Sequence, residues 1–228
     1  FFFNKDVVML VHLGMTGKFF FVNRKRTKYK TSFYYDINED KDKKHDRIIF
    51  NLSNNQKLIY NDVRKFGFIK FIQRASLEQN AHLKHLGPEP MSAKFNIGYF
   101  KDYTTGKERN IKNILMDQKF ISGLGNIYVN EILFLSGVKP VKKIKKLTDV
   151  EIKKIIKFTK KIISKAIILG GSSIKDFSSS SGKKGSFQQY FNVYGKKGEN
   201  CPKVKCKGKI KKIVVSNRAS FFCNKCQK

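Results

Sequence analysis

The stretch Ile111-Lys112-Asn113-Ile114-Leu115-Met116-Asp117-Gln118, continued by Ser122-Gly123-Leu124-Gly125-Asn126-Ile127-Tyr128-Val129-Asn130-Glu131, decides the fold of the central part of the chain. Apolar residues recur at helical spacing in both halves; they are Ile111, Ile114, Leu115, Tyr128, Ile132 and Leu135. Gly123 and Gly125 separate the halves and permit a sharp turn. Asn126 follows as the expected N-cap of the second helix, whose first amides would form an anion site. An ordinary helical hairpin is the alternative interpretation.

The charge balance points to a polyanionic partner. The 228 residues include 48 Lys and Arg against 17 Asp and Glu, a formal net charge of +31. Such an excess causes self-repulsion unless it meets a polyanion, so nucleic acid is the first candidate and an anionic membrane the second. Biased codon usage would explain some of the lysine, but not its placement beside glycines and cysteines. No apolar run approaches the roughly 20 residues of a membrane span, and no secretory leader is visible.

The N-terminal part predicts an antiparallel sheet structure. Short runs rich in β-branched and aromatic residues are separated by polar or glycine-containing turns. These runs are Val7–Leu13, Lys18–Val22, Arg47–Leu52, Lys57–Tyr60 and Gly67–Ile72. His45 ends a polar connection and is expected to be exposed. The Gly-Pro-Glu-Pro block at 87–90 breaks the pattern and predicts a domain boundary.

A third helix is predicted after the hairpin. Pro140 is expected to stop the second helix, and Thr148 with Glu151 forms a capping box for the third. The apolar face of the third helix comprises Ile152, Ile155, Ile156, Ile162 and Ile163, and Gly170-Gly171 ends it. Its lysines are interpreted as the solvated face. The serine- and lysine-rich stretch at 178–186 predicts either a linker or a mobile loop that closes over a ligand.

The four cysteines predict a structural zinc site. Cys223 and Cys226 have the C-x2-C spacing of a zinc knuckle, and Cys201 and Cys206 have a C-x4-C spacing within the usual range. The pairs flank a predicted hairpin with strands at 213–215 and 219–223 and with Ser216-Asn217-Arg218 at its turn. A redox role would need only one pair. Structural zinc contributes on the order of 10–16 kcal/mol of apparent binding energy, enough to fold a small basic ribbon.

Seven blocks, in order, resemble bacterial formamidopyrimidine-DNA glycosylase, a family that excises oxidised purines. They are His12–Gly17, Asp62–Gly67, Leu86–Pro90, Asp117–Gln118 with Gly123–Tyr128, Phe187–Gln189, Val193–Gly198 and Asn217–Cys223. The resemblance implies an α+β multidomain protein. Its expected parts are a partial N-terminal antiparallel β-sandwich (1–85), a central helical domain with a helix–two-turn–helix and a lesion loop (86–190), and a C-terminal zinc ribbon (191–228). It also implies a bacterial cytoplasmic monomer bound to double-stranded DNA that contains an oxidised base, without a membrane partner.

The family takes its target base out of the stack, and three residues match its void-filling set. An apolar wedge can replace the base, and a planar cation can hydrogen-bond the partner left behind. Met15 and Phe66 match the wedges, and Arg64 matches the cation. Taken alone, Met15 and Phe66 would be interpreted as core residues and Arg64 as a surface charge. The resemblance implies that the three act together.

Further residues match the family's DNA contacts. Lys112 and Asn126 match phosphate contacts of the helix–two-turn–helix, and His45 matches a DNA-contacting histidine. Arg218 matches the ribbon arginine, which grips phosphates flanking the lesion and assists the final elimination. Glu108 stands where the family has a basic residue, so that contact is carried over only weakly.

The family's nucleophile is an N-terminal proline followed by a glutamate, with a lysine further along the first domain. An α-amino group has a pKa near 8, so it is partly neutral and nucleophilic at physiological pH. None of these positions occurs here, because the chain begins Phe1-Phe2-Phe3 well inside the matched domain. We therefore expect an N-terminally truncated sequence. Its polypeptide should bind duplex DNA weakly, without forming the Schiff base that leads to β- and δ-elimination and AP-lyase activity.

Three alternatives remain open. The endonuclease VIII branch prefers oxidised pyrimidines, although the Met15, Arg64 and Phe66 set and the Gly-Pro-Glu-Pro block favour the purine branch. The chain could instead be a non-catalytic zinc-ribbon DNA-binding protein, which the sequence upstream of Phe1 would discriminate. A zinc-ribbon RNA-binding protein is the third alternative, but wedge residues have no evident use on single-stranded RNA.

Overall fold

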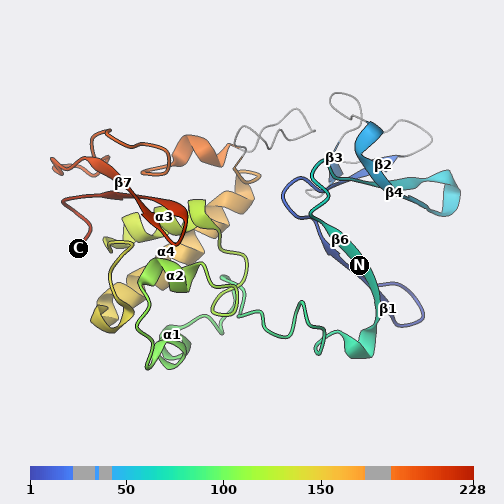
Figure 1. The fold of residues 1–228 in the computed structure, drawn as a ribbon, viewed down its shortest axis with the longest axis horizontal. Helices are drawn as coiled ribbons and strands as arrows, with labels where there is room; N and C mark the ends of the chain where they lie inside the picture. Colours follow the sequence, from blue (N-terminus) through green and yellow to red (C-terminus); the bar gives the residue numbers. More distant parts are fainter. Residues whose placement is uncertain (23–33, 36–42, 173–185) are drawn as a thin grey trace. The chain divides into compact units, whose positions relative to one another are not determined.

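The computed structural model describes residues 1–22, 34–35, 43–172 and 186–228. The loop predicted at 178–186 lies outside the described residues except for its last position. The chain forms two compact units (Figure 1). The first combines Phe1–Asn80 with Leu169–Gln188, and the second combines Ala81–Ile168 with Gln189–Lys228.

The first unit contains two sheets. Its strands are β1 (Val7–His12), β2 (Lys18–Val22), β3 (Tyr34–Tyr35), β4 (Asp46–Asn51), β5 (Lys57–Asn61) and β6 (Phe68–Gln73). β1 pairs with β6, and the second sheet has the order β3-β2-β5-β4. The five predicted strands are confirmed to within one residue at each end. The expectation of an antiparallel sheet holds for all the described pairs except β2 with β3, which run parallel. Phe19, Leu58 and Tyr60 form a core cluster in this unit.

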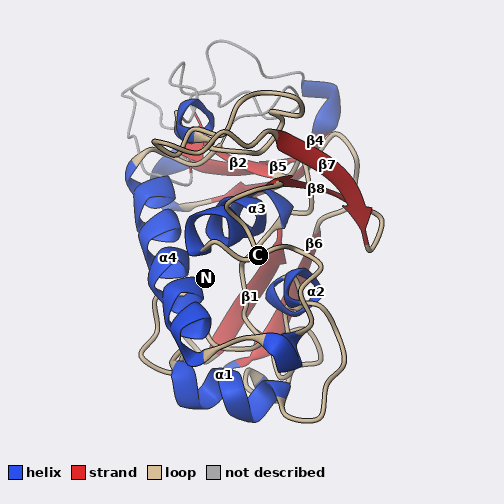
Figure 2. Ribbon diagram, turned by 90° about the vertical axis from the view of Figure 1, so that its left-hand side faces the viewer, coloured by secondary structure: helices blue, strands red, loops and turns tan. Residues whose placement is uncertain are grey.

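The second unit is built around a central helix. Its helices are α1 (Ile97–Thr104), α2 (Ile111–Leu115), α3 (Asn126–Ser136) and α4 (Asp149–Ile168), and its strands are β7 (Ile210–Val215) and β8 (Arg218–Cys223). α3 packs against α2, α4 and β8. Figure 2 shows it between α4 and the β7–β8 hairpin. Val129, Ile132 and Leu133 of α3 are fully buried, because neighbours surround the helix rather than covering one stripe.

Short 3-10 helices complete the described chain. They are η1 (Lys43–His45), η2 (Ser53–Asn55), η3 (Arg74–Ser76), η4 (Ile144–Lys146) and η5 (Phe187–Tyr190). No helix in the described part of the chain is long and apolar enough to cross a bilayer.

Two predicted boundaries of the second helix are wrong. Gly125 is the N-cap of α3 and Asn126 is the first helical residue, because the Asn126 amide is engaged elsewhere, at Ala219. The helix ends at Ser136 rather than at Pro140. Gly137 adopts a left-handed conformation with φ 75°, and its N–H closes the last turn. This glycine cap stops the helix before the proline is reached.

The capping box of the third helix is confirmed. The Thr148 N–H donates to Glu151 Oε2 at 2.9 Å, and the Glu151 N–H donates to Thr148 Oγ1 at 3.3 Å. These reciprocal bonds satisfy two of the amides that a helix leaves open at its start. Helix α4 then begins at Asp149 and ends at Ile168, just before Gly170 with φ 70°.

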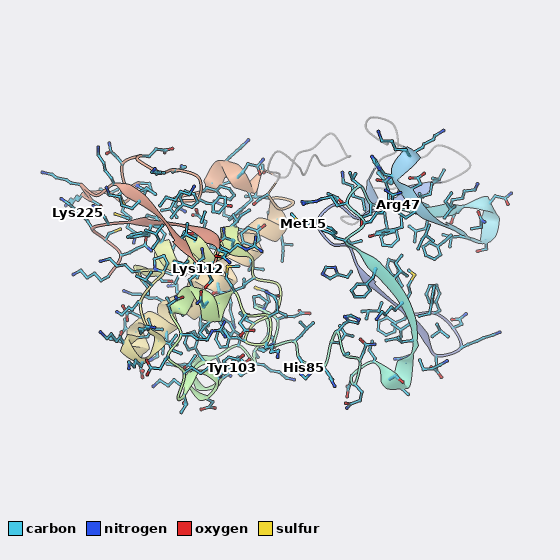
Figure 3. The ribbon with its side chains drawn as sticks, viewed as in Figure 1. Met15, Arg47, His85, Tyr103, Lys112 and Lys225 are labelled. Carbon is cyan, nitrogen blue, oxygen red and sulfur yellow. The ribbon has the colours of Figure 1, made fainter. Side chains whose placement is uncertain are left out.

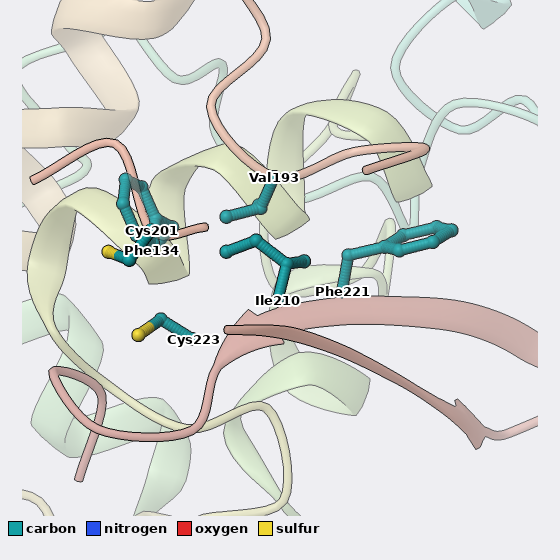
Figure 4. Packing of buried hydrophobic residues seen from close by; sticks show 6 residues of the cluster. All are labelled: Phe134, Val193, Cys201, Ile210, Phe221 and Cys223. Carbon is teal, nitrogen blue, oxygen red and sulfur yellow. The ribbon is translucent and has the colours of Figure 1, made fainter. Parts of the chain in front are cut away.

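The C-terminal hairpin shares its core with helix α3. Ser216 and Asn217 form its two-residue turn with φ 49° and 57°, the positive values that a type I′ turn requires. One hydrophobic cluster then joins the helix to the hairpin and the cysteines. Its members are Phe134, Val193, Cys201, Ile210, Phe221 and Cys223 (Figure 4).

Candidate nucleic-acid interface and metal site

Met15, Arg64 and Phe66 meet at an exposed position of the first unit. Arg64 Nη1 lies 3.3 Å from Met15 Sδ, and the Arg64 guanidinium carbon lies 5.0 Å from the centre of the Phe66 ring. Met15 is 47% exposed and Phe66 is 59% exposed, so neither belongs to the core (Figure 3 labels Met15). We call these three residues the tip. Two apolar side chains and a planar cation at the surface have the chemistry needed to enter a base stack.

A buried carboxylate, Asp62, organises the loops that carry the tip. It is 1% exposed and accepts hydrogen bonds from Thr16 Oγ1 at 2.5 Å and from the Gly67 N–H at 3.0 Å. It also accepts from the Tyr60 hydroxyl at 3.1 Å and the Arg64 N–H at 3.2 Å. Burial alone would raise the pKa of Asp62, but these donors lower it below its usual value. Burial, followed by the nearby Asp62 charge, raises the pKa of Tyr60 to about 12.

His45 contacts the backbone of the same residue, Asp62. Its backbone carbonyl accepts a hydrogen bond from the Asp62 N–H at 3.0 Å, which holds it against the end of β5. His45 is therefore half-buried, and the expectation that it is exposed is wrong. Its Nδ1 lies 3.4 Å from Arg47 Nη2, and Arg47 Nε donates to the Asp62 carbonyl at 2.9 Å. The predicted DNA contact of His45 stays a prediction.

In the second unit, the predicted phosphate-binding residues converge on one carbonyl. Lys112 Nζ donates to Ala219 O at 2.9 Å and to Ser220 Oγ at 2.6 Å. Asn126 Nδ2 donates to Ala219 O at 3.1 Å, and Arg218 directly precedes that residue in β8. Lys112 is 1% exposed and lies inside the unit (Figure 3). Burial, followed by the positive charge of Arg218, lowers the pKa of Lys112 to about 8.

A cavity of about 390 Å³ lies beside these residues. Helix α2, the turn after it and the β7–β8 hairpin line the cavity; the residues are Arg109, Lys112, Asn113, Met116, Asp117, Gln118, Val215, Ser216 and Arg218. The Asp117 carboxylate in its wall is paired with Arg109 Nη1 at 2.6 Å. Because its acid is neutralised while Lys112 and Arg218 remain, the cavity suits an anion.

Gln118 braces the glycine turn that follows. Its Oε1 accepts a hydrogen bond from the Gly123 N–H at 2.8 Å, and its Nε2 donates to Leu124 O at 2.9 Å. Gly123 has φ 81°, a conformation that glycine adopts without strain. Gly125 has an extended conformation with φ −118°, so of the two glycines only Gly123 adopts the left-handed conformation that a sharp turn favours.

Glu108 is neutralised by a neighbouring lysine. Its carboxylate accepts from Lys145 Nζ at 2.9 Å, and this bond lowers the pKa of Glu108. Its backbone carbonyl accepts from Lys143 Nζ at 2.9 Å. Two lysine side chains therefore contact Glu108, the position at which the family has a basic residue.

Two buried polar residues of α3 were missed by the sequence reasoning. Asn130 is fully buried, and its Oδ1 accepts from the Phe221 N–H at 2.6 Å. Glu131 is also fully buried, and its carboxylate accepts from the backbone N–H groups of Val193 at 3.0 Å and Tyr194 at 2.9 Å. Adjacent polar residues inside an apolar helix are the signal that could have found them, because burial without a partner is costly.

The four cysteines have the geometry of a single metal site. All four Sγ atoms lie within 4.8 Å of one another. Cys201 Sγ lies 3.7 Å from Cys226 Sγ, and Cys206 Sγ lies 3.7 Å from Cys223 Sγ. A tetrahedral ion with bonds of about 2.3 Å to sulfur separates its ligands by about 3.8 Å, whereas a disulfide bond is only about 2.05 Å long.

The electrostatics at Cys223 favour a thiolate. Burial raises the pKa of the Cys223 thiol, but hydrogen bonds from the backbone N–H groups of Cys226 and Lys225 act against it. The result is a pKa of about 7, below the usual value. Burial instead raises the pKa values of Cys201 and Cys226 above the usual value. Because metal ligands must be deprotonated, it is the spacing of the four sulfur atoms that fits a bound metal ion.

Models of protein families match two stretches of this chain. The formamidopyrimidine-DNA glycosylase N-terminal domain matches residues 1–69, and the formamidopyrimidine-DNA glycosylase H2TH domain matches residues 86–178. Curated relatives agree. The formamidopyrimidine-DNA glycosylase of Rickettsia bellii is 40% identical over 226 residues, covering 99% of this chain and 77% of that protein. That of Rhodopseudomonas palustris (strain HaA2) is 36% identical, covering 96% and 76%.

Solved structures give the same result. Lactococcus lactis Fpg in complex with DNA containing an abasic site has a TM-score of 0.78 and 33% identity, covering 98% of this chain and 76% of that chain. Wild-type L. lactis Fpg (MutM) with DNA containing N7-benzyl-Fapy-dG has a TM-score of 0.79 at the same identity and coverage. The chain spans about three quarters of the length of these proteins. It belongs to the formamidopyrimidine-DNA glycosylase family.

Proposed function

We propose that this protein is a base-excision-repair DNA glycosylase that removes oxidised purines, such as formamidopyrimidines and 8-oxoguanine, from duplex DNA. Family membership supports the reaction class. The observation that carries the proposal is the tip, where a guanidinium contacts two exposed apolar side chains. Exposed apolar side chains grouped around a cation are typical of a surface that contacts another molecule.

The tip offsets the cost of removing a base from the stack. Unstacking and unpairing cost a few kcal/mol. Met15 and Phe66 would fill the space that the base vacates, and Arg64 would donate hydrogen bonds to the base left without a partner. The cation–π contact with Phe66 restricts the guanidinium before DNA arrives, so less entropy is lost on insertion.

The second unit is proposed to hold the phosphates that flank the lesion. Arg218 and Lys112 supply positive charge at the cavity, and Asn126 supplies an amide at the start of α3. Arg218 would also assist the elimination step of the AP-lyase reaction. His45 is proposed to contact DNA from the first unit.

The metal ion at the four cysteines is proposed to be zinc. Four thiolates at tetrahedral spacing are the ligand set of structural zinc sites. The ion would cross-link the segment before β7 to the end of β8 and the residues that follow it, and would take no part in the reaction. The protein is proposed to act as a monomer, because one chain carries all the DNA-contacting residues named above, and to act on chromosomal DNA in the cytoplasm.

Fluorescence anisotropy with four duplexes tests the function. They carry a formamidopyrimidine, an abasic-site analogue, an oxidised pyrimidine or no lesion. We expect the protein to bind the first two most tightly. Arg64→Ala should reduce the ratio of affinities for damaged and undamaged duplex by about tenfold or more, because the variant loses a charged hydrogen bond. Arg74→Ala removes the same charge from the same unit and should retain the preference.

Two outcomes would contradict the proposal. Equal affinity for all four duplexes would support a non-catalytic DNA-binding protein. A preference for the oxidised pyrimidine would place the protein with the endonuclease VIII branch.

A further inference from the structure

Side chains, rather than a third strand, close the outer edge of β8. Among the residues that the structure describes, this strand pairs only with β7, so backbone groups that point the other way need partners. Helix α3 supplies them. Asn130 Oδ1 accepts from the Phe221 N–H at 2.6 Å, and Asn130 Nδ2 approaches Ala219 O at 3.5 Å. One carboxamide thus occupies the place that a peptide group of a neighbouring strand would take.

The same carboxamide is bonded to the start of its own helix. Asn130 Nδ2 donates to the Asn126 carbonyl at 2.6 Å and lies 3.3 Å from Asn126 Oδ1. The Asn126 amide in turn donates to Ala219 O. Asn130 is fully buried and, unlike Lys112, does not line the proposed phosphate-binding cavity. It connects Asn126, at the start of α3, to Ala219, which directly follows the cavity-lining Arg218.

We infer that Asn130 is a positioning residue that fixes the register of β8 on α3 and thereby places Arg218 beside Asn126. The inference rests on the proposed phosphate-binding role of Arg218. A shift of β8 by one residue would turn the Arg218 side chain to the opposite face of the hairpin. It would also break the hydrogen bond from the Phe221 N–H to Asn130 Oδ1. Both groups would then be buried without a partner, which costs free energy. The same register therefore pairs the buried polar groups and directs the Arg218 side chain to the cavity that it lines.

A purely structural role for Asn130 predicts something different. Any buried polar residue of α3 would then behave alike when it is removed. Ser136 provides the matched control, because it is 4% exposed on the same helix and its Oγ donates to Ile132 O at 2.7 Å. This bond stays within the helix and does not involve β8.

A double-mutant cycle separates the two roles. The affinity of the whole chain for a duplex with an abasic-site analogue is measured against salt concentration for the wild type, Asn130→Ala, Arg218→Ala, the double variant and Ser136→Ala. Arg218→Ala should weaken binding about tenfold or more and flatten the log–log salt slope by about 0.9 for each phosphate that the variant no longer neutralises. Asn130→Ala should weaken binding and flatten the slope in the same direction. In the Arg218→Ala background it should add less than about twofold.

Ser136→Ala should leave the slope unchanged, even where it lowers thermal stability. The inference is overturned if Asn130→Ala weakens binding by the same factor in both backgrounds, or if it leaves the slope unchanged. A general folding defect would produce the first of these results. Wild-type affinity and slope for Arg218→Ala would instead overturn the role proposed for the arginine, and the inference with it.

Discussion

At the scale of single residues, Asp62 holds the loops of the tip together through hydrogen bonds. Four donors converge on a carboxylate that is 1% exposed. Asp62→Asn keeps the shape but turns one acceptor into a donor that faces other donors. We expect it to lower the free energy of unfolding by about 2–4 kcal/mol, measured by urea denaturation. Asp149→Asn, at an exposed pair with Lys101, should change it by less than about 1 kcal/mol.

The pH dependence of this effect has a defined sign. The folded pKa of Asp62 is lowered, so its contribution is fully present above the unfolded pKa near 4 and is lost as pH falls below it. The difference in unfolding free energy between the wild type and Asp62→Asn should therefore shrink below about pH 4. A difference that stays constant down to about pH 2.5 would show that the Asp62 carboxylate is not favoured in its charged form.

Lys112 should make DNA binding depend on pH near neutrality. Its pKa of about 8 means that the free protein loses this charge as pH rises through that value. A phosphate favours the protonated amine, so affinity should fall above about pH 8 at constant ionic strength. Lys112→Met should bind more weakly at about pH 7 and lose this pH-dependent step. The variant Lys94→Met, which removes an exposed lysine, should retain the fall in affinity. If Lys94→Met also lost this fall, the pH dependence would not belong to Lys112.

At the scale of elements, the sequence predicted what local patterns control. Five strands and the Thr148 capping box were located correctly, because alternation and capping act within a few residues. The N-cap predicted at Asn126 was wrong: the Asn126 amide donates to Ala219, 93 positions away, and Gly125 is the N-cap of α3. Asn130 was missed for the same reason, since Phe221 lies 91 positions along the chain. Spacing alone does not report such long-range partners.

The candidate site divides in the same way. The cysteine spacing predicted a cluster that the structure brings within one coordination sphere. The tip residues, by contrast, have no helical or strand periodicity, and only the resemblance to a family joined Met15 with Arg64 and Phe66. Their supporting Asp62 lies in a matching block, but nothing in the spacing gives it a role. Its function becomes visible only where loops 46 positions apart meet at Thr16.

At the scale of the whole molecule, the ribbon and the central helix share one hydrophobic core. The hydrophobic cluster includes Phe134 of α3 together with Cys201 and Cys223. Removing the metal with a chelator should therefore increase hydrogen–deuterium exchange in α3 as well as around the cysteines. Strands β2 and β5 of the first unit should keep their protection. Increased exchange confined to 191–228 would show that the ribbon melts alone, as its sequence by itself suggests.

The Asp62 network separates the residues that hold the tip from those that would touch DNA. Met15 and Phe66 are largely exposed, whereas Asp62 and Tyr60 are buried. Substitutions of exposed residues that lack a structural role usually change stability by less than about 0.5 kcal/mol. A lineage could therefore exchange the tip side chains, and so alter which damage it recognises, without first acquiring compensating mutations. We therefore expect positions 15 and 66 to tolerate substitution over evolutionary time, and position 62 to retain aspartate.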